Sequence, residues 1–368
     1  MLAGKIRVGV LFGGRSGEHA VSLLSAASVM AAMDKNKYDI IPIGITEDGQ
    51  WLAGGDPLQA LRKKEFPRGC FLASLVTNPL DPGLFLFKDG KVVDFISLDV
   101  VFPVLHGPYG EDGTVQGLLE LAGIPYVGAG VLASSAGMDK EVMKILFQRC
   151  GLPVADFIAF KDYRWRKERS SIIELVEKKI GYPCFIKPAN LGSSVGVSKA
   201  SGQDGLIAGI ELALRYDRKA IVEVFIDGRE IECSVLGGDD PISSVPGEII
   251  PSSDFYDYRA KYIDNRSQLI IPAPLDAEAQ EKIRRYAIQA FQAVDCSGLG
   301  RVDFFYREKG KEIYVSEINT MPGFTEISMY PRLWEYSGVP YGELIDKLVE
   351  IALERQRQKS RLLTRYKA

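Results

Sequence analysis

Two carboxylates and an asparagine near the end of the chain have the residue types and the spacing of a metal site. Asp303 lies in an apolar stretch over 299–306, and Glu317 and Asn319 close a second one over 312–318. The turn between the stretches is polar and contains glycine, which predicts a β-hairpin. Residues two apart on a strand point the same way, so the paired strands can bring all three side chains onto one face. This set of oxygen ligands suits Mg²⁺ better than Zn²⁺, and Mg²⁺ takes its other ligands from phosphates and water, which indicates nucleotide chemistry.

The neighbours of this cluster could stabilise an anion during a reaction. Arg301 lies two residues before Asp303, on the same strand face, and an arginine beside a metal can stabilise developing negative charge. The alternative for Arg301 is a surface ion pair. Residues 322–328 follow the cluster and have neither strand nor helix periodicity. The backbone N–H of Gly323 could bind an oxyanion there, and the alternative is a connecting loop.

A glycine- and serine-rich segment in the middle of the chain is a candidate phosphate-binding loop. The segment 192–196, Gly-Ser-Ser-Val-Gly, follows Lys187 closely. Glycine and hydroxyl residues let backbone N–H groups approach a phosphate, and Lys187 can neutralise the phosphate charge. An ordinary Gly/Ser turn explains the segment equally well, and its spacing is not that of a P-loop.

Two further glycine-rich loops follow apolar, strand-like stretches. The first, residues 13–17, precedes an expected helix whose N-terminus could attract an anion. A tight turn, with Glu18 favouring the start of the helix, explains its spacing better. The second loop, residues 106–113, lies at the carboxyl end of a strand, where open α/β sheets place their ligands. Substrate binding and simple capping of the next helix by Asp112 are equally consistent with this loop.

The connection between two expected strands, residues 223–230, has residue types that suit a nucleoside. Phe225 and Ile226 could form an apolar slot for adenine, and Glu223 or Glu230 could accept a hydrogen bond from a ribose hydroxyl. A β-connection with solvated acidic residues is the simpler interpretation and the favoured one on these residues alone.

The composition excludes several classes of protein. The chain has 368 residues, 46% of them hydrophobic, and a net charge of −3, so it lacks the basic footprint of a general nucleic-acid-binding protein. Its five cysteines form no CxxC pair and it has only two histidines, which disfavours zinc and fits a reducing cytoplasm. We find no apolar run of about 18 residues and no signal peptide, so we expect no membrane span and no export.

The first third of the sequence alternates strand and helix patterns, which predicts a parallel α/β sheet. Residues 46–97 carry a weak signal, and we expect only a peripheral hairpin and loops there. The strands are expected over 6–12, 38–45 and 99–105, and the helices over 20–33 and 114–122.

The remainder predicts a helical segment over 134–150 and then two α+β regions. Residues 252–266 are polar and tyrosine-rich without periodicity, as in a functional lid. The basic, amphipathic tail over 355–367 is expected to be a solvated helix end, and a membrane contact is the weaker alternative. Strands are expected over 155–160, 184–187, 220–225, 231–236, 268–272, 299–306 and 312–318, and helices over 171–180, 204–216, 277–294, 330–337 and 341–355.

Taken together, the motifs resemble those of the D-alanine–D-alanine ligases of the ATP-grasp superfamily. They occur in that family's order over nearly the whole chain, and their combination is specific although each motif alone is not. The matching motifs are GGRSGE over 13–18, HGPYGEDG over 106–113, SAGMDK over 135–140, KPANLGSSVG over 187–196, FYDYRAKY over 255–262, GRVD over 300–303 and EINTMPG over 317–323.

The resemblance implies an α/β (α+β) protein with the three-domain ATP-grasp fold and a parallel α/β domain at its N-terminus. We expect a substrate-binding N-terminal domain over 1–128 and a central ATP-grasp domain over 129–229. The C-terminal ATP-grasp and metal-binding domain would occupy 230–368 and would carry the loop 252–266. ATP would lie between the last two domains.

The resemblance also implies which residues meet the nucleotide and its metal ions. Two Mg²⁺ ions are expected, which Mn²⁺ can replace. The implied contacts are Lys140, Lys187, Glu223, Phe225, Ile226 and Glu230 for ATP, Ser193 and Ser194 for the loop over its phosphates, and Asp303, Glu317 and Asn319 for the metal ions.

Further residues are implied for the amino acid substrates and for catalysis. The first D-alanine would meet Glu18 and His106, and the carboxylate of the second would meet Ser328 and Lys261. Two groups would complete the site, namely a hydrogen-bonded set of Glu18, Ser193 and Tyr262, and an oxyanion hole formed by Arg301 and the N–H of Gly323.

The activity that the resemblance implies is the ATP-dependent joining of two D-alanine molecules through an acyl phosphate. The products would be D-alanyl-D-alanine, ADP and phosphate, and the dipeptide would serve peptidoglycan synthesis and so cell-wall formation and cell shape. The resemblance further implies a homodimer, with D-alanine and ATP as the small-molecule partners.

Two alternatives remain open on the sequence alone. Another ATP-grasp enzyme, such as a biotin carboxylase-like or glutathione synthase-like ligase, would lack the combination of Glu18, the loop 106–113 and Lys261-Tyr262. A catalytically silent ATP-binding module would have lost Arg301 or a metal carboxylate, and these are present. Phosphate release that depends on D-alanine separates the three hypotheses.

Overall fold

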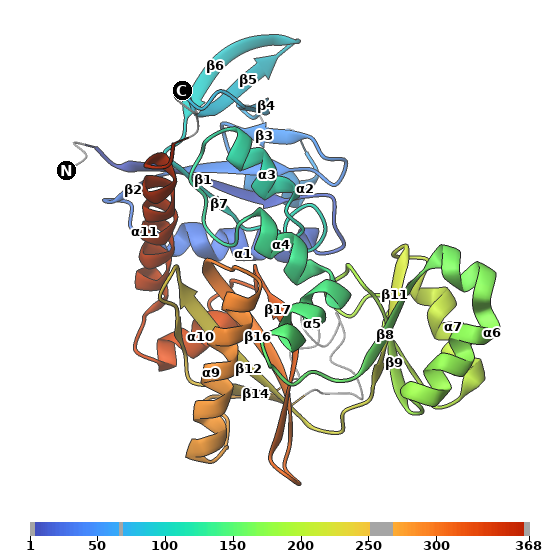
Figure 1. Ribbon diagram of the computed structural model, residues 1–368. Coiled ribbons are helices and arrows are strands. Elements are labelled where there is room, and N and C mark those ends of the chain that lie inside the picture. Colours follow the sequence, from blue (N-terminus) through green and yellow to red (C-terminus); the bar gives the residue numbers. More distant parts are fainter. Residues whose placement is uncertain (1–3, 66–68, 251–267, 364–368) are drawn as a thin grey trace.

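The strands of the protein form three sheets, which the chain builds one after another (Figure 1). The structure is a computed structural model that describes residues 4–65, 69–250 and 268–363. Within these ranges the sheets have seven, four and six strands. The mixed α/β class expected from the sequence is confirmed. None of the helices in these ranges combines the length and the hydrophobicity that a membrane span requires.

The first sheet is parallel over its last three strands, β2, β1 and β7, as the alternating pattern predicts. β1 (Ile6–Gly13) pairs in parallel with β2 (Tyr38–Ile45) and with β7 (Val100–Pro103). Helices α1 (His19–Ala32) and α3 (Thr114–Leu121) begin and end within one residue of the expected ranges, 20–33 and 114–122. The last six residues of β1 are all buried, which is typical of a strand covered on both faces.

Residues 46–97 contribute far more to this sheet than the peripheral hairpin and loops that we expected. The hairpin exists, as β5 and β6, but β3 and β4 join it to β2, and all of these added pairings are antiparallel. The strands are short and carry apolar residues on both faces, which hides their alternation in the sequence. The elements are β3 (Trp51–Ala53), α2 (Pro57–Lys63), β4 (Phe71–Val76), β5 (Gly83–Lys88) and β6 (Lys91–Ser97).

Two helices, rather than the single helical segment expected over 134–150, link the first sheet to the second. α4 (Val131–Met138) ends and α5 (Lys140–Arg149) begins at Asp139. The Asp139 side chain accepts hydrogen bonds from the backbone N–H groups of Glu141 and Val142, so it caps α5. The prediction missed this break because an aspartate inside an apolar period was taken as part of one helix.

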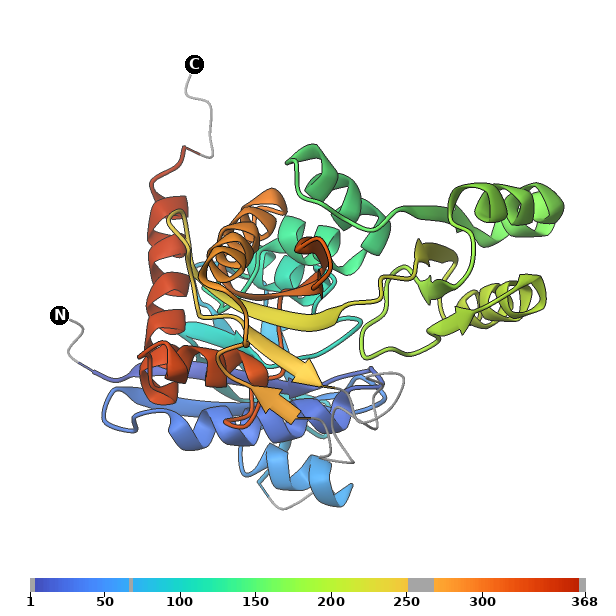
Figure 2. The ribbon, with the colours of Figure 1, turned by 90° about the horizontal axis from the view of Figure 1, so that it is seen from below.

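The second sheet forms a unit that stands to one side of the rest of the molecule (Figures 1 and 2). Its strands are antiparallel, and two helices pack on it around a core of their own. α6 begins well before the expected residue 171 and carries a kink at Glu168, in a charged stretch without an apolar period. The elements are β8 (Phe157–Lys161), α6 (Asp162–Lys179), β9 (Cys184–Pro188), β10 (Ser198–Ala200), α7 (Gln203–Ala213) and β11 (Lys219–Val224).

The third sheet is antiparallel and contains the predicted hairpin, β16 and β17. Its order is β15-β14-β12-β16-β17, with β13 paired to β12. The short strands β13 and β14 were not predicted. The elements are β12 (Arg229–Gly237), β13 (Ile242–Ser243), β14 (Gly247–Ile250), β15 (Gln268–Ile270), α9 (Ala277–Ala293), β16 (Gly298–Arg307), β17 (Glu312–Asn319), α10 (Met329–Tyr336) and α11 (Tyr341–Ser360).

The first and third sheets share one hydrophobic core. Val8 and Phe102 of the first sheet, Leu299 of the third and Leu348 of α11 belong to the same buried cluster. Figure 1 shows α11 running beside both sheets. These two sheets therefore form one packed body.

The helical tail contacts the rest of the protein at its start, through Arg355, whereas residues 357–363 are exposed, as expected for a solvated helix end. The Arg355 guanidinium donates to the carbonyls of Gly128 (2.6 Å) and Tyr126 (2.7 Å) and lies over the Tyr126 ring. Both carbonyls lie between α3 and α4, so Arg355 ties α11 to the segment that leads into α4. Periodicity identified the apolar face of the helix but could not identify carbonyl groups as partners.

We expect Gly13→Ala to lower the free energy of unfolding by at least about 2 kcal/mol. Gly13 has a φ of +90°, and a Cβ there would lie 2.1 Å from the carbonyl oxygen of Ile45. Gly117→Ala is the matched control, because Gly117 lies in α3 and a Cβ there meets nothing within 4 Å. Alanine should stabilise that helix by up to about 1 kcal/mol. Urea unfolding of both variants measures the difference, and equal midpoints would contradict the expectation.

Candidate active site

A cavity of about 750 Å³ lies between the three sheets and receives side chains from all of them. Every site residue predicted from the sequence lines this cavity, except Lys261 and Tyr262, which lie outside the described residues together with the whole of the expected lid over 252–266. The lining residues of the predicted set are Glu18, His106, Lys140, Lys187, Ser193, Ser194, Glu223, Phe225, Ile226, Glu230, Arg301, Asp303, Glu317, Asn319, Gly323 and Ser328.

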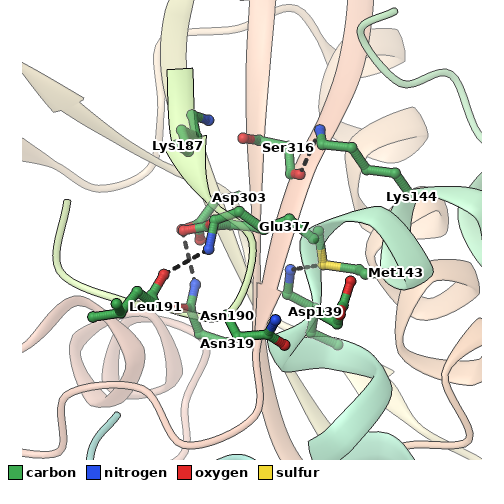
Figure 3. Close-up of polar contacts among 12 residues, drawn as sticks. Asp139, Met143, Lys144, Lys187, Asn190, Leu191, Asp303, Ser316, Glu317 and Asn319 are labelled. Atoms are coloured by element: carbon green, nitrogen blue, oxygen red, sulfur yellow. Dashed lines mark hydrogen bonds and ion pairs between the residues drawn. The ribbon is translucent and has the colours of Figure 1, made fainter. Parts of the chain in front are cut away.

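The predicted carboxylate cluster is present on β16 and β17. The two strands place Asp303 directly opposite Glu317, and Arg301 opposite Asn319. Asp303 accepts from Arg301 at both carboxylate oxygens, each at 2.7 Å. It also accepts from the Asn319 amide at 3.0 Å (Figure 3). The hairpin thus brings all three proposed metal ligands onto one face, as their spacing predicted, and Arg301 is half-buried against them rather than paired at the surface.

The donor set fits Mg²⁺ and does not fit zinc. Among the described residues, no group of three or more His, Cys, Asp or Glu side chains is arranged to hold a metal ion. The site instead offers the carboxylates of Asp303 and Glu317 and the amide of Asn319, which are oxygen ligands. Such a set leaves several positions around Mg²⁺ for phosphate oxygens and water, as is usual for nucleotide-binding sites.

Two lysines of the cavity contact carboxylate or carbonyl oxygens that a bound phosphate could replace. Lys140 Nζ donates to the Leu191 carbonyl at 2.7 Å and lies 3.7 Å from Glu317. Lys187 Nζ donates to Glu223 at 2.9 Å. Burial lowers the pKa of Lys187, but the carboxylates of Glu223 and Glu317 outweigh this effect and raise it. Lys187 is therefore a charged cation beside the phosphate-loop candidate.

A third lysine, Lys144, was missed by the sequence analysis. It is only 1% exposed, lies 3.3 Å from Glu223 and donates to the Ser316 carbonyl at 3.1 Å (Figure 3). Burial alone would raise the pKa of Glu223, but Lys144 and Lys187 lower it to about 2. The sequence does contain a feature that could have identified Lys144 as a site residue. Lys144 follows Lys140 by one helical turn, and its neighbour Met143 is apolar.

The connection after β11 forms one wall of the cavity, as a nucleoside slot requires. The rings of Phe185 and Phe225 lie 5.8 Å apart, and the ammonium of Lys199 lies 3.9 Å from the centre of the Phe225 ring. Ile226 and Glu230 line the same wall. The simpler interpretation was a connection whose acidic residues are solvated. It does not account for the position of this segment on the cavity wall.

The glycine- and serine-rich loop contacts the first helix. The Ser193 hydroxyl donates to the Glu18 carboxylate. Ser193 and Ser194 have φ values of 50° and 57°, in the left-handed region, where residues other than glycine are uncommon. This conformation, together with the link to Glu18, holds the loop across the cavity. Tyr262, the third member expected in this hydrogen-bonded set, lies outside the described residues.

The loop after β7 holds a buried histidine and a partly buried glutamate. His106 is 4% exposed, and its ring nitrogens face the Ser25 hydroxyl (3.1 Å) and the Met321 carbonyl (3.0 Å). Burial lowers the pKa of His106, although the Glu18 carboxylate opposes this. Glu111 accepts from the backbone N–H of Gly107 at 2.6 Å, and burial and the charge of Glu18 raise its pKa to about 8. Glu111 belongs to a motif that we had noted, but the sequence suggested no role for it.

The loop after β17 completes the cavity. Gly323 lines it, and the Ser328 hydroxyl accepts from the backbone N–H of Thr325 at 3.1 Å. Asp112 accepts from the N–H of Thr114, the first residue of α3, at 3.0 Å, but the N-cap of this helix is Gly113, so Asp112 is not the capping residue that the alternative expected.

Comparison with known proteins gives consistent matches over nearly the whole chain. Residues 7–129 match the family model "D-ala D-ala ligase N-terminus", and residues 146–350 match "D-ala D-ala ligase C-terminus". A relative named D-alanine–D-alanine ligase from Natranaerobius thermophilus is 52% identical over 97% of each chain. One of the same name from Heliobacterium modesticaldum is 50% identical over 98% of each chain.

Solved structures with similar folds carry related names. The VanG D-Ala:D-Ser ligase from Enterococcus faecalis has a TM-score of 0.85 and 38% identity, over 95% of this chain and 99% of that one. The D-alanine–D-alanine ligase from Coxiella burnetii has a TM-score of 0.83 and 34% identity, over 97% of each chain. The similarity thus extends over all three sheets.

Proposed function

The chain belongs to the D-alanine–D-alanine ligase family, and we propose that it joins two D-alanine molecules in an ATP-dependent reaction that supplies a peptidoglycan precursor. The observation that carries this proposal is the cavity. It gathers the lysines, the oxygen ligands, the arginine and the glycine loop that such a reaction needs, and they come from three sheets that are far apart in the sequence.

The first step is the activation of a carboxylate, which is a poor acyl donor because oxide is a poor leaving group. Transfer of the γ-phosphate of ATP to the first D-alanine gives an acyl phosphate. We assign Lys140 and Lys187 to the phosphates, since each now faces a carboxylate or carbonyl that a phosphate can replace. Asp303, Glu317 and Asn319 would hold Mg²⁺, which neutralises phosphate charge when bound.

The nucleotide and the first amino acid would occupy opposite ends of the cavity. We assign the adenosine to the wall formed by Glu223, Phe225, Ile226 and Glu230. The first D-alanine would lie by Glu18, whose carboxylate can pair with its ammonium group. His106 is buried below this position with both ring nitrogens engaged, so its contribution would be to the shape and polarity of the pocket floor.

In the second step the amine of the second D-alanine attacks the acyl phosphate. The tetrahedral oxyanion would be stabilised by the Arg301 guanidinium and the Gly323 N–H. Ser328 and Lys261 would receive the second carboxylate. The Ser193 loop, linked to Glu18, and Tyr262 would exclude water, which otherwise hydrolyses the acyl phosphate.

Several finer features of the protein are part of the same proposal. These are two Mg²⁺ ions, which Mn²⁺ can replace, a homodimeric assembly and a cytoplasmic location. The domains would be residues 1–128, 129–229 and 230–368, which is supported by the change of sheet after β7 and again after β11.

Phosphate release with product mass tests the function. We expect release only when ATP, Mg²⁺ and D-alanine are all present, with D-alanyl-D-alanine as the product and no release with L-alanine or after chelation of the metal. D-Serine and D-lactate are offered together with D-alanine, because a structural neighbour is a D-Ala:D-Ser ligase. A mixed product in preference to the D-alanine dipeptide would overturn the substrate assignment, and release without D-alanine would overturn the activity.

A further inference from the structure

A third carboxylate lies beside the two on the β16–β17 hairpin. Glu232 on β12 is directly opposite Asp303 on β16, and Asp303 is directly opposite Glu317 on β17. Residues opposite each other in an antiparallel pair share a face of the sheet, so the three carboxylates form one row across three strands, and all three line the cavity. Like charges in such positions repel one another, so the row requires a cation within it.

Arg301 is the cation between the first two carboxylates of this row. Its Nε donates to Asp303 at 2.7 Å and lies 3.0 Å from a carboxylate oxygen of Glu232. Its Nη2 donates to the other oxygen of Asp303, also at 2.7 Å. The side chains of Arg301 and Glu232 are only 14% and 6% exposed. The ion pair is therefore held firmly, because separating the partners would leave a charge in a position that water hardly reaches.

Asp303 cannot serve Arg301 and a metal ion at full strength together. Both of its oxygens accept from Arg301, whereas the proposed function assigns Asp303 to Mg²⁺ as well. A bound cation takes at least one of these oxygens and so weakens the hold of Asp303 on the guanidinium. Glu232 already lies within hydrogen-bond distance of the Arg301 Nε, so it can accept the Nε hydrogen that Asp303 gives up.

We propose that Glu232 is a positioning residue for the reaction, which keeps the Arg301 guanidinium at the developing oxyanion while Asp303 is engaged with the metal ion. This proposal rests on the proposed function. Glu232 does not touch the reacting atoms in this scheme and acts through Arg301. Within residues 4–65, 69–250 and 268–363, no three His, Cys, Asp or Glu side chains are arranged to hold a metal ion, which favours Arg301 over the metal as the partner of Glu232.

Glu232→Gln keeps the volume of the side chain and removes its charge, so that Arg301 depends on Asp303 alone. For this variant we expect kcat to fall by about tenfold or more and the KM for ATP to change by less than about twofold. We also expect Mn²⁺ to bind about threefold or more weakly in the presence of ADP, because Arg301 then competes harder for the oxygens of Asp303. Electron paramagnetic resonance of free Mn²⁺ measures this affinity without turnover.

The double variant Arg301→Ala/Glu232→Gln tests whether Glu232 acts through Arg301. Without Arg301 there is no guanidinium for Glu232 to hold, so adding Glu232→Gln to Arg301→Ala should change turnover and Mn²⁺ affinity by less than about twofold. Equal effects of Glu232→Gln with and without Arg301 would overturn the positioning role. An unchanged kcat in Glu232→Gln with Arg301 present would overturn it as well.

The matched control is Glu248→Gln, which makes the same change at another buried glutamate of the third sheet. Glu248 accepts from the Arg229 guanidinium at 2.8 and 2.7 Å, and neither residue lines the cavity. Urea unfolding should show a loss of stability in this variant, whereas its kcat and its Mn²⁺ affinity should equal those of the wild type. A fall in kcat as large as that of Glu232→Gln would overturn the positioning role, since lost stability alone would explain both. Absence of D-alanine-dependent phosphate release in the wild-type protein would overturn the proposed function itself.

Discussion

Arg301→Ala should bind ATP and lose at least about a hundredfold in turnover. Arg301 contacts both oxygens of Asp303 and lies 3.0 Å from Glu232, so its guanidinium is held rigidly beside the proposed reaction centre. Removal of a preorganised donor to an oxyanion costs catalysis far more than binding. Turnover is measured by phosphate release, and ATP affinity by equilibrium binding in the absence of D-alanine.

The same strand offers a matched control for this variant. Arg307 lies at the exposed end of β16 and pairs with Glu312 at 3.0 Å, so Arg307→Ala also removes an arginine from an ion pair but does so outside the cavity. We expect its turnover to match that of the wild type. Arg301→Lys keeps the charge without the two-pronged contact and should be intermediate. Turnover near the wild-type level in Arg301→Ala would contradict the role assigned to Arg301.

Lys144→Met should lower the free energy of unfolding by about 3 kcal/mol and raise the KM for ATP. Lys144 and Glu223 form an ion pair that is almost wholly removed from water. Without Lys144, the buried Glu223 carboxylate depends on Lys187 alone, so Lys187 is held more tightly and is less free to bind a phosphate. Urea unfolding measures the first effect, and steady-state kinetics with varied ATP measure the second.

The double variant Lys144→Met/Glu223→Gln separates the buried charge from the loss of packing. Neutralising Glu223 should restore most of the stability, because the cost comes from an unpaired buried carboxylate. Lys347→Met is the surface control: its pair with Glu343 is one turn apart on α11 and exposed, and such pairs contribute at most about 0.5 kcal/mol. If Lys144→Met were no less stable than Lys347→Met, the ion pair between Lys144 and Glu223 would not contribute to the stability of the fold.

Local sequence was enough to predict how the carboxylate cluster of β16 and β17 is arranged. The β16–β17 hairpin is a short-range structure, so periodicity and one glycine-containing turn were sufficient to place Asp303 opposite Glu317. The same holds for β1, β2 and β7, whose apolar runs are continuous because the strands are buried. Assigning roles to the lining residues required the resemblance to a family as well, since each loop had an ordinary alternative.

The features that were not predicted depend on contacts between distant parts of the chain. Lys144 binds the Ser316 carbonyl across 172 positions, and the Met321 peptide binds His106 across 215. A backbone carbonyl has no side-chain signature, so neither partner could be identified from residue types. The strands β3 and β4 were missed for a related reason, since they are short and are stabilised by their neighbours in the sheet.

The second sheet has a core of its own, so this unit is joined to the rest of the molecule differently from the other two sheets. Apolar packing joins the first and third sheets into one body, whereas the contacts between the second unit and α5 include polar ones such as the Lys219 pairs with Asp139 and Glu141, each 2.7 Å. Polar contacts can be exchanged for water at little cost, but a shared apolar core cannot be. The molecule is therefore built as two bodies with separate apolar cores that are joined in part by polar contacts. Trp334 lies in the core shared by the first and third sheets and Trp165 in the core of the second, so each core carries an intrinsic fluorescent reporter.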